Sequence, residues 1–192
     1  NVHMGRFNVS NQYRPGVKEL IPGLRKNNFG LYVLSGDNDT EKNNLQSIFG
    51  SATTMQFEQS PQQKLDFIKT LQENKRVLML GDGLNDAGAL MQSNVGIAVS
   101  DNTAQFSPAC DAILDGGKVA LLNNFMAFAR SGKTIVTASF ILSILYNIVG
   151  LSFAVQGILS PMVAAILMPA SSISIVLLVT VLSSLSARSK GL

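Results

Sequence analysis

The ten residues from Gly81 to Leu90 read GDGLNDAGAL and carry two carboxylates, Asp82 and Asp86, four positions apart on a glycine-rich turn. The apolar run over 77–80 that precedes them predicts a buried strand, and a helix is expected to begin after Asp86. Two neighbouring carboxylates repel each other unless a cation lies between them, and Mg²⁺ is a hard ion that carboxylates and a phosphate commonly hold. Asn85 adds an amide that can donate to a phosphate oxygen. The segment therefore predicts the Mg²⁺ corner of a phosphoryl-transfer site.

Two other segments could face the same phosphate. The run SGDN begins at Ser35, directly after an apolar stretch, and sets a hydroxyl and the acid Asp37 at the end of a predicted strand. Lys64 falls on the first turn of a helix that Pro61 should begin, where an ammonium opposes the helix dipole unless an anion faces it. The structural alternatives are a turn in which Asp37 bonds its own backbone and a solvated lysine. Because active residues gather at the carboxyl ends of parallel strands, Ser35 and Asp82 are expected to share a site.

The elements that must position these residues alternate along the first part of the chain. Short apolar runs bounded by turn residues predict strands, and apolar residues at helical spacing between them predict helices. Strands alternating with helices form a parallel sheet, so the expected fold class is α/β with a doubly wound sheet. The predicted strands cover 6–13, 31–34, 53–57, 77–80, 95–99 and 112–114, and the predicted helices cover 15–27, 40–49, 61–74, a segment after 86, and 118–133.

The charged residues are distributed unevenly. From Thr134 to Ala187 the sequence runs for 54 residues without Asp, Glu, Lys, Arg or His. A membrane span needs about 20 residues, so two spans are expected, at about 135–157 and 161–186, after the connecting helix 118–133. Basic residues flank both spans, which favours a cytoplasmic soluble part and a cytoplasmic C-terminus. The net charge of +3 is small, and the basic residues form no stripe along the sequence, which argues against a nucleic-acid partner.

Four side chains inside the predicted spans could contact an ion. Tyr146 and Asn147 lie in the first span, and Met168 and Ser172 lie in the second, four residues apart and so on one helix face. Polar groups at this depth often mark a transport pathway. The alternative is packing between helices, which is the favoured interpretation for Ser171.

These features together resemble the C-terminal part of a P-type cation-transporting ATPase. SGDN is similar to the family's Thr-Gly-Asp-Asn motif, with Ser35 in the Thr position, and Pro61 to Lys64 is similar to its Pro-x-x-Lys element. GDGLNDAGAL matches its Gly-Asp-Gly-x-Asn-Asp-x-x-Ala-Leu segment. The resemblance implies a partial haloacid-dehalogenase-like Rossmannoid sheet over residues 1–117, as the C-terminal part of the phosphorylation domain, followed by a transmembrane α-helical hairpin within 134–192.

The resemblance also implies roles for individual residues. The phosphate-accepting Asp of Asp-Lys-Thr-Gly-Thr is absent from the sequence, so a longer parent would supply it and would bind most of the ATP. The chain alone is therefore expected neither to hydrolyse ATP nor to pump. The residues implied to contact the aspartyl-phosphate are Ser35, Gly36, Asp37 and Lys64, those implied to hold Mg²⁺ are Asp82 and Asp86, and Asn85 would assist.

The hairpin resembles the copper(I) branch of the heavy-metal pumps. That branch has Tyr-Asn on its penultimate span and Met-x-x-Ser-Ser on its last, as in Tyr146-Asn147 and in Met168 with Ser172. A thioether suits a soft monovalent ion, whereas the zinc branch uses a Lys and an Asp in these spans. The implied cargo is Cu⁺, the implied partners are membrane lipid and a copper chaperone, and the implied location is the bacterial inner (plasma) membrane.

Three alternatives stay open from the sequence. One is a membrane-anchored haloacid-dehalogenase-like phosphatase, another is a heavy-metal pump of other ion specificity, and the third is a non-catalytic, membrane-tethered binding module. The parent sequence upstream of Asn1 would separate them, because a pump requires Asp-Lys-Thr-Gly-Thr and a phosphatase requires Asp-x-Asp.

Overall fold

The structure is a computed structural model that describes residues 13–82, 84–101, 109–158 and 160–192. The chain divides into two compact units at Leu122. We call the unit up to Leu122 the head and the unit from Asn123 onward the hairpin, and each is described by itself. Most of the strand predicted over 6–13 lies outside the described residues.

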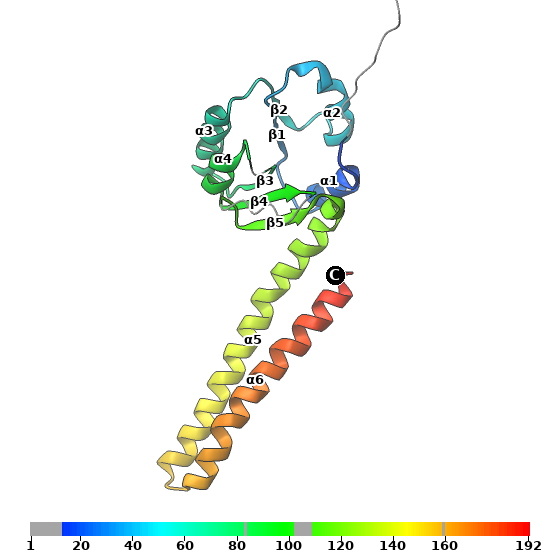
Figure 1. Ribbon diagram of the computed structural model, residues 1–192. Helices are drawn as coiled ribbons and strands as arrows, with labels where there is room; N and C mark the ends of the chain where they lie inside the picture. Colours follow the sequence, from blue (N-terminus) through cyan, green and yellow to red (C-terminus); the bar gives the residue numbers. More distant parts are fainter. Residues whose placement is uncertain (1–12, 83, 102–108, 159) are drawn as a thin grey trace, which may run out of the picture. The chain divides into compact units, whose positions relative to one another are not determined.

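The strands of the head form two parallel sheets (Figure 1). Strands β1 (Tyr32–Leu34) and β2 (Thr54–Gln56) make one sheet, in which Tyr32 lies opposite Thr54. Strands β3 (Leu78–Gly81), β4 (Val95–Ser100) and β5 (Ala112–Asp115) make the other, in that order. The predicted α/β class with parallel strands is confirmed. The strands form two sheets instead of the one expected, since β1 and β3 are not hydrogen-bonded to each other in the described part of the chain.

Helices connect these strands. The sequence reasons for α3 are clear, because Ser60 and Gln63 form a reciprocal capping box and Pro61 occupies the first helical position. The Ser60 hydroxyl accepts from the Gln63 N–H at 3.2 Å, and the Gln63 side-chain oxygen accepts from the Ser60 N–H at 2.8 Å. The helices of the head are α1 (Val17–Lys26), α2 (Lys42–Phe49), α3 (Pro61–Gln72) and α4 (Ala87–Gln92), with 3₁₀ turns η1 (Asp39–Glu41) and η2 (Gly116–Leu121).

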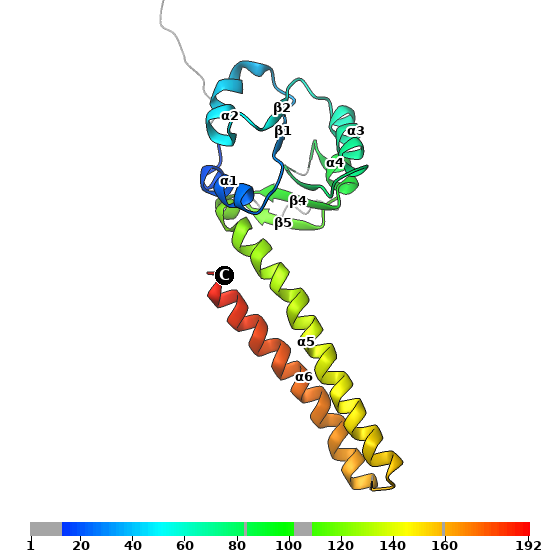
Figure 2. The ribbon, with the colours of Figure 1, turned by 180° about the vertical axis from the view of Figure 1, so that it is seen from behind.

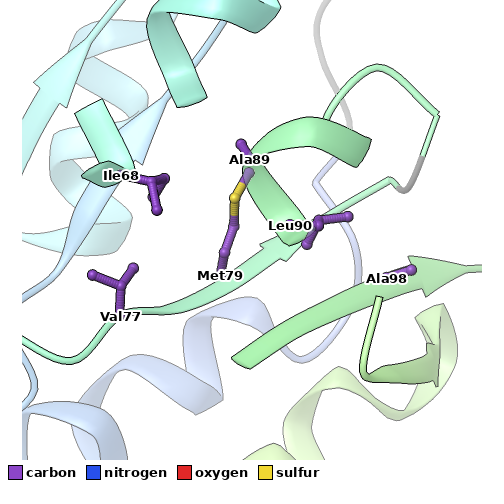
Figure 3. Packing of buried hydrophobic residues seen from close by; sticks show 6 residues of the cluster. All are labelled: Ile68, Val77, Met79, Ala89, Leu90 and Ala98. Carbon is purple, nitrogen blue, oxygen red and sulfur yellow. The ribbon is translucent and has the colours of Figure 1, made fainter. Parts of the chain in front are cut away.

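The core that supports the end of β3 lies where α3 and α4 pack against β3 and β4. Leu90 is completely buried there, and Ala89 beside it is 1% exposed (Figure 3). Helix α4 lies so close to β4 that a Cβ at Gly96 would be 2.4 Å from the Leu90 carbonyl oxygen, which explains why glycine occupies this position. The cluster consists of Ile68, Val77, Met79, Ala89, Leu90 and Ala98.

The hairpin consists of two long helices, α5 (Leu122–Val155) and α6 (Pro161–Ser189), which run side by side in both views (Figures 1 and 2). Both are long and apolar enough to cross a membrane. Gly157 takes a positive φ of 68° in the turn between them, and the Ser160 hydroxyl caps α6 by accepting from the Val163 N–H.

The two helices meet along a repeating set of half-buried positions, which we call the seam. On α5 these positions recur every three or four residues, which is the spacing of one helix face. The same spacing occurs on α6, while most other side chains of the hairpin are exposed. The seam comprises Ala138, Leu142, Tyr146 and Gly150 on α5, and Ala164, Leu167, Ser171, Ser174 and Leu178 on α6.

Candidate functional site

The predicted Mg²⁺ corner lies where β3 ends. Asp82 follows the last residue of the strand, and its Oδ1 accepts from the backbone N–H groups of Leu84 at 3.2 Å and Asn85 at 3.3 Å. These bonds hold the turn before α4, and they leave the side chains of Asp82 and Asn85 exposed. A Cβ at Gly81 would be 2.9 Å from Asp86 Oδ2, so glycine here allows the Asp86 carboxylate to lie against the strand end.

Lys64 reaches this corner from the first turn of α3. Its Nζ lies 2.8 Å from Asp86 Oδ1, and the two side chains are only 12% and 14% exposed. The close packing of α3 against α4 brings these groups together across 22 positions of sequence. Removing two charges from water costs free energy, so a nearly buried ion pair often adds little to the stability of the fold. A role of Lys64 and Asp86 in binding or catalysis explains their position better. An ammonium beside carboxylates can neutralise a phosphate while oxygen atoms remain for a hard cation.

The SGDN turn follows β1 and is held both by its own side chains and by backbone bonds to the segment before α3. The Ser35 hydroxyl accepts from the Asp37 N–H at 3.1 Å, and Asn38 Oδ1 accepts from the Thr40 N–H at 3.2 Å. Three backbone bonds tie the turn to the segment before α3. Ser35 N–H donates to the Gln56 carbonyl at 2.9 Å, Glu58 N–H donates to the Asp37 carbonyl at 2.8 Å, and Gln59 N–H donates to the Ser35 carbonyl at 2.9 Å. The Ser35 hydroxyl is therefore engaged within the turn, and Ser35 follows the carboxyl end of β1 as Asp82 follows that of β3.

The structure brings together part of the predicted set. Lys64 and Asp86 are in contact, and Asp82 and Asn85 share one turn with Asp86. Within the described residues no hydrogen bond or ion pair links the SGDN turn to that pair, so Ser35, Gly36 and Asp37 form a separate half of the candidate site. Gly36 and Asp37 are exposed, and Gly83, between the two acids of the Mg²⁺ corner, lies outside the described residues.

Tyr13 lies beside the SGDN half and was not singled out from the sequence. Its phenol donates to Glu41 Oε2 at 3.0 Å. Burial raises the pKa of Tyr13 above its ordinary value, and the hydrogen bond and charge of Glu41 and the charge of Asp37 raise it further. No sequence signal pointed to this contact, because the two residues lie 28 positions apart in the sequence.

The four intramembrane candidates do not converge within the hairpin. Tyr146 lies in the seam, whereas Asn147, Met168 and Ser172 are exposed, Met168 to 74%. Asn147 donates to the Ser143 carbonyl at 2.9 Å, and Ser172 bonds the Met168 carbonyl at 3.4 Å, each within its own helix. Ser172 also lines an open groove on α6 with Ile173, Val176, Leu177, Thr180 and Val181.

Sequence reasoning missed Ser174. Its hydroxyl oxygen lies 2.9 Å from the Tyr146 phenol oxygen, which makes a polar contact between α5 and α6. The available signal was its position two residues after Ser172 on the seam face, but its partner lies 28 positions away on the other helix.

Comparison with known proteins places these features in a family. The family model of haloacid dehalogenase-like hydrolases matches residues 3–94. The nitrogen fixation protein FixI of Rhizobium leguminosarum bv. viciae is 31% identical over 91% of this chain, and a probable copper-importing P-type ATPase A of Enterococcus hirae is 28% identical over 91%. The chain spans only 23% and 24% of the length of these two relatives.

Solved structures show the same fold. A zinc-transporting PIB-type ATPase in its E2.Pi state superposes with a TM-score of 0.76 at 19% identity, covering 90% of this chain and 28% of that one. The catalytic CPx-ATPase domain CopB-B superposes with a TM-score of 0.54 at 29% identity, covering 62% of this chain and 48% of that one. The chain therefore combines a haloacid dehalogenase-like hydrolase domain with two candidate membrane helices, and its relatives include P-type ATPases that match about nine-tenths of its length.

Proposed function

We propose that this chain is the C-terminal part of an ATP-driven pump that moves copper(I) across a membrane. The observation that carries the proposal is the nearly buried Lys64–Asp86 pair at the end of β3, because it sets an ammonium beside a carboxylate one turn from the second acid, Asp82. Lys64 and Ser35 would contact the phosphoryl group, with Gly36 and Asp37 shaping the turn beside it. Asp82 and Asp86 would hold Mg²⁺, and Asn85 would assist.

The donor set of the corner fits Mg²⁺. The Oδ1 atoms of Asp82 and Asp86 already bond to backbone N–H groups and to Lys64, and each carboxylate has a second oxygen. Hard oxygen atoms are what Mg²⁺ prefers, and the ion usually completes its shell with phosphate and water. When bound, the ion would supply charge neutralisation for the transferred phosphoryl group.

The residues of this chain would position and neutralise, and a parent protein would supply the phosphate-accepting Asp. Catalysis of phosphoryl transfer is mostly positioning and charge stabilisation, which is the role of the Lys64 ammonium. β1 and β3 carry the two halves of the candidate site and are not paired with each other. A parallel strand of the parent between them would bring its own carboxyl end beside Ser35 and Asp82.

In the hairpin, Asn147, Met168 and Ser172 would contact the ion, and Tyr146 belongs to the same path. A thioether suits Cu⁺, and the span from Thr134 to Ala187 contains no acid or base except the phenol of Tyr146. The exposure of Met168 leaves its sulfur free for an ion or for further spans of the parent. Basic residues at both ends favour a cytoplasmic head in a bacterial inner membrane, with lipid and a copper chaperone as partners.

The head is tested by turnover of the phosphorylated intermediate in the full-length parent. Lys64→Ala should slow it by about two orders of magnitude, because a charge aimed at the transferred group is removed. Lys69→Ala is the matched control on the same helix, since its ion pair with Asp66 is 53% and 58% exposed. Equal rates in the two variants would contradict the proposed role of Lys64.

The ion path is tested by copper-stimulated ATP hydrolysis in the same parent. Met168→Ala and Asn147→Ala should abolish the stimulation. Met162→Ala is a matched control, because Met162 is 75% exposed on the same helix and Met168 is 74% exposed. Stimulation by zinc rather than copper in the unmodified parent would indicate a pump of other specificity, and hydrolysis that no metal stimulates would favour a membrane-anchored phosphatase.

A further inference from the structure

The hydrogen bond between Tyr146 and Ser174 has a direction that can be worked out. The Ser174 hydroxyl donates to the Ala170 carbonyl at 2.7 Å, and its oxygen lies 2.9 Å from the Tyr146 phenol oxygen. A serine hydroxyl has a single hydrogen, and in this geometry Ala170 receives it. The phenol must therefore donate to Ser174, so the bonds run from Tyr146 on α5 through Ser174 into the backbone of α6.

This arrangement differs from that of other hydroxyls in the hairpin. Ser152 donates to the Ile148 carbonyl at 2.8 Å, and Ser171 donates to the Met168 carbonyl at 2.8 Å, each within its own helix. Such bonds satisfy a hydroxyl without relating one helix to the other. Tyr146 and Ser174 are both half-buried in the seam, where a cross-helix bond fixes how far one helix is shifted along the other.

The point of attachment on α6 lies beside the proposed ion ligands. Pro169 sits inside α6 and has no N–H, so this turn lacks one of its backbone hydrogen bonds. Ala170, where the hydrogen-bond chain ends, follows Pro169 directly and lies two residues after Met168. At the other end, Asn147 follows Tyr146 directly. The bond therefore connects the two backbone segments that carry Asn147 and Met168.

We propose that Tyr146 and Ser174 are positioning residues that set the register of α5 against α6 and hold Asn147 and Met168 at matching depths for the transported ion. The proposal rests on the proposed function for the identity of the ion. In this proposal Tyr146 affects the ion path indirectly, because the hydrogen bond that it donates to Ser174 fixes the register of the two helices.

The direction of the bond makes the two single substitutions unequal. Tyr146→Phe leaves the Ser174 hydroxyl bonded to Ala170, so no polar group loses its only partner. Ser174→Ala leaves the phenol hydrogen without an acceptor in the seam, which costs more than losing the bond itself. Ser174→Ala should therefore be the more harmful change, and the double variant should resemble Tyr146→Phe.

The experiment measures copper-stimulated ATP hydrolysis and thermal unfolding of the full-length parent in detergent. Ser174→Ala should raise the half-saturating copper concentration at least threefold, the size of an average interhelical hydrogen bond in membranes, with the maximal rate unchanged. Adding Tyr146→Phe should restore part of that loss and raise the unfolding midpoint of Ser174→Ala. Ser152→Ala, which removes a hydroxyl bonded only to its own helix, is the matched control and should change neither quantity.

Additive effects of the two substitutions on the unfolding midpoint would overturn the proposal, and so would an equal loss from Ser152→Ala. A lower maximal rate at an unchanged copper requirement would do the same, because it would place the pair in turnover rather than in positioning. A parent that copper does not stimulate would refute the proposed ion, and the coupling between positions 146 and 174 in thermal unfolding would still decide the register claim.

Discussion

The head and the hairpin satisfy their polar side chains in different ways. In the head, several polar side chains join different elements, as when Lys64 on α3 contacts Asp86 at the start of α4, or when Gln72 and Gln92 exchange bonds at 2.8 Å. In the hairpin, most hydroxyl and amide groups bond to a carbonyl one turn back on the same helix, as Asn147 does. The bond between Tyr146 and Ser174 is an exception, because it joins the two helices.

This difference indicates how complete each region is. A contact between distant elements forms only when the fold is assembled, so the Lys64–Asp86 corner is positioned within this chain. A hydroxyl bonded to its own helix constrains no other element, so exposed groups such as Met168 and Ser172 depend on something outside the hairpin to complete their environment. Under the proposed function, the head would be half of a chemical site, and the hairpin would be one wall of an ion path.

The largest expected loss of stability comes from a substitution that breaks a contact between two elements. Lys64→Ala should destabilise the head by about 3 kcal/mol, because it leaves the Asp86 carboxylate nearly buried without its cation. Lys69→Ala should cost less than about 1 kcal/mol, since its ion pair is more than half exposed. Urea unfolding of the chain in detergent, followed by circular dichroism, measures both. Similar losses in the two variants would mean that the Lys64–Asp86 pair is as weak as a surface pair.

A glycine in each region sharpens the comparison through opposite signs. Gly96→Ala should destabilise the head by about 2 kcal/mol, because the new Cβ would lie 2.4 Å from the Leu90 carbonyl oxygen. Gly132→Ala in α5 should stabilise the chain by up to about 1 kcal/mol, since nothing lies within 4 Å and alanine favours a helix. The same urea titration decides the signs, and a stabilising Gly96→Ala would refute the close approach of α4 to β4.

Sequence reasoning succeeded where the signal is local and failed where the partner is remote. Ser60 and Pro61 correctly predicted the start of α3, and the apolar run before Asp82 correctly predicted β3. Lys64 was expected to face an anion because it lies on the first turn of α3, but its partner in the structure is the Asp86 carboxylate. The division of the sheet could not be predicted, because strand pairing depends on segments far apart in the chain. Ser174 was missed for the same reason, since a serine in a span looks alike whether it bonds its own helix or another.

The smallest expected effect concerns Tyr13 and appears only at high pH. Burial, and then Glu41, raise the pKa of its phenol, so the folded chain keeps this proton to a higher pH than the unfolded chain does. The unfolded state therefore binds fewer protons above about pH 10, and the contribution of Tyr13 to stability falls as pH rises through that range. Tyr13→Phe should unfold with a shallower loss of stability between about pH 9 and 11 than the unmodified chain, although lysines titrate in both. Parallel curves for the two proteins would show that burial and the contact with Glu41 do not hold the proton on Tyr13.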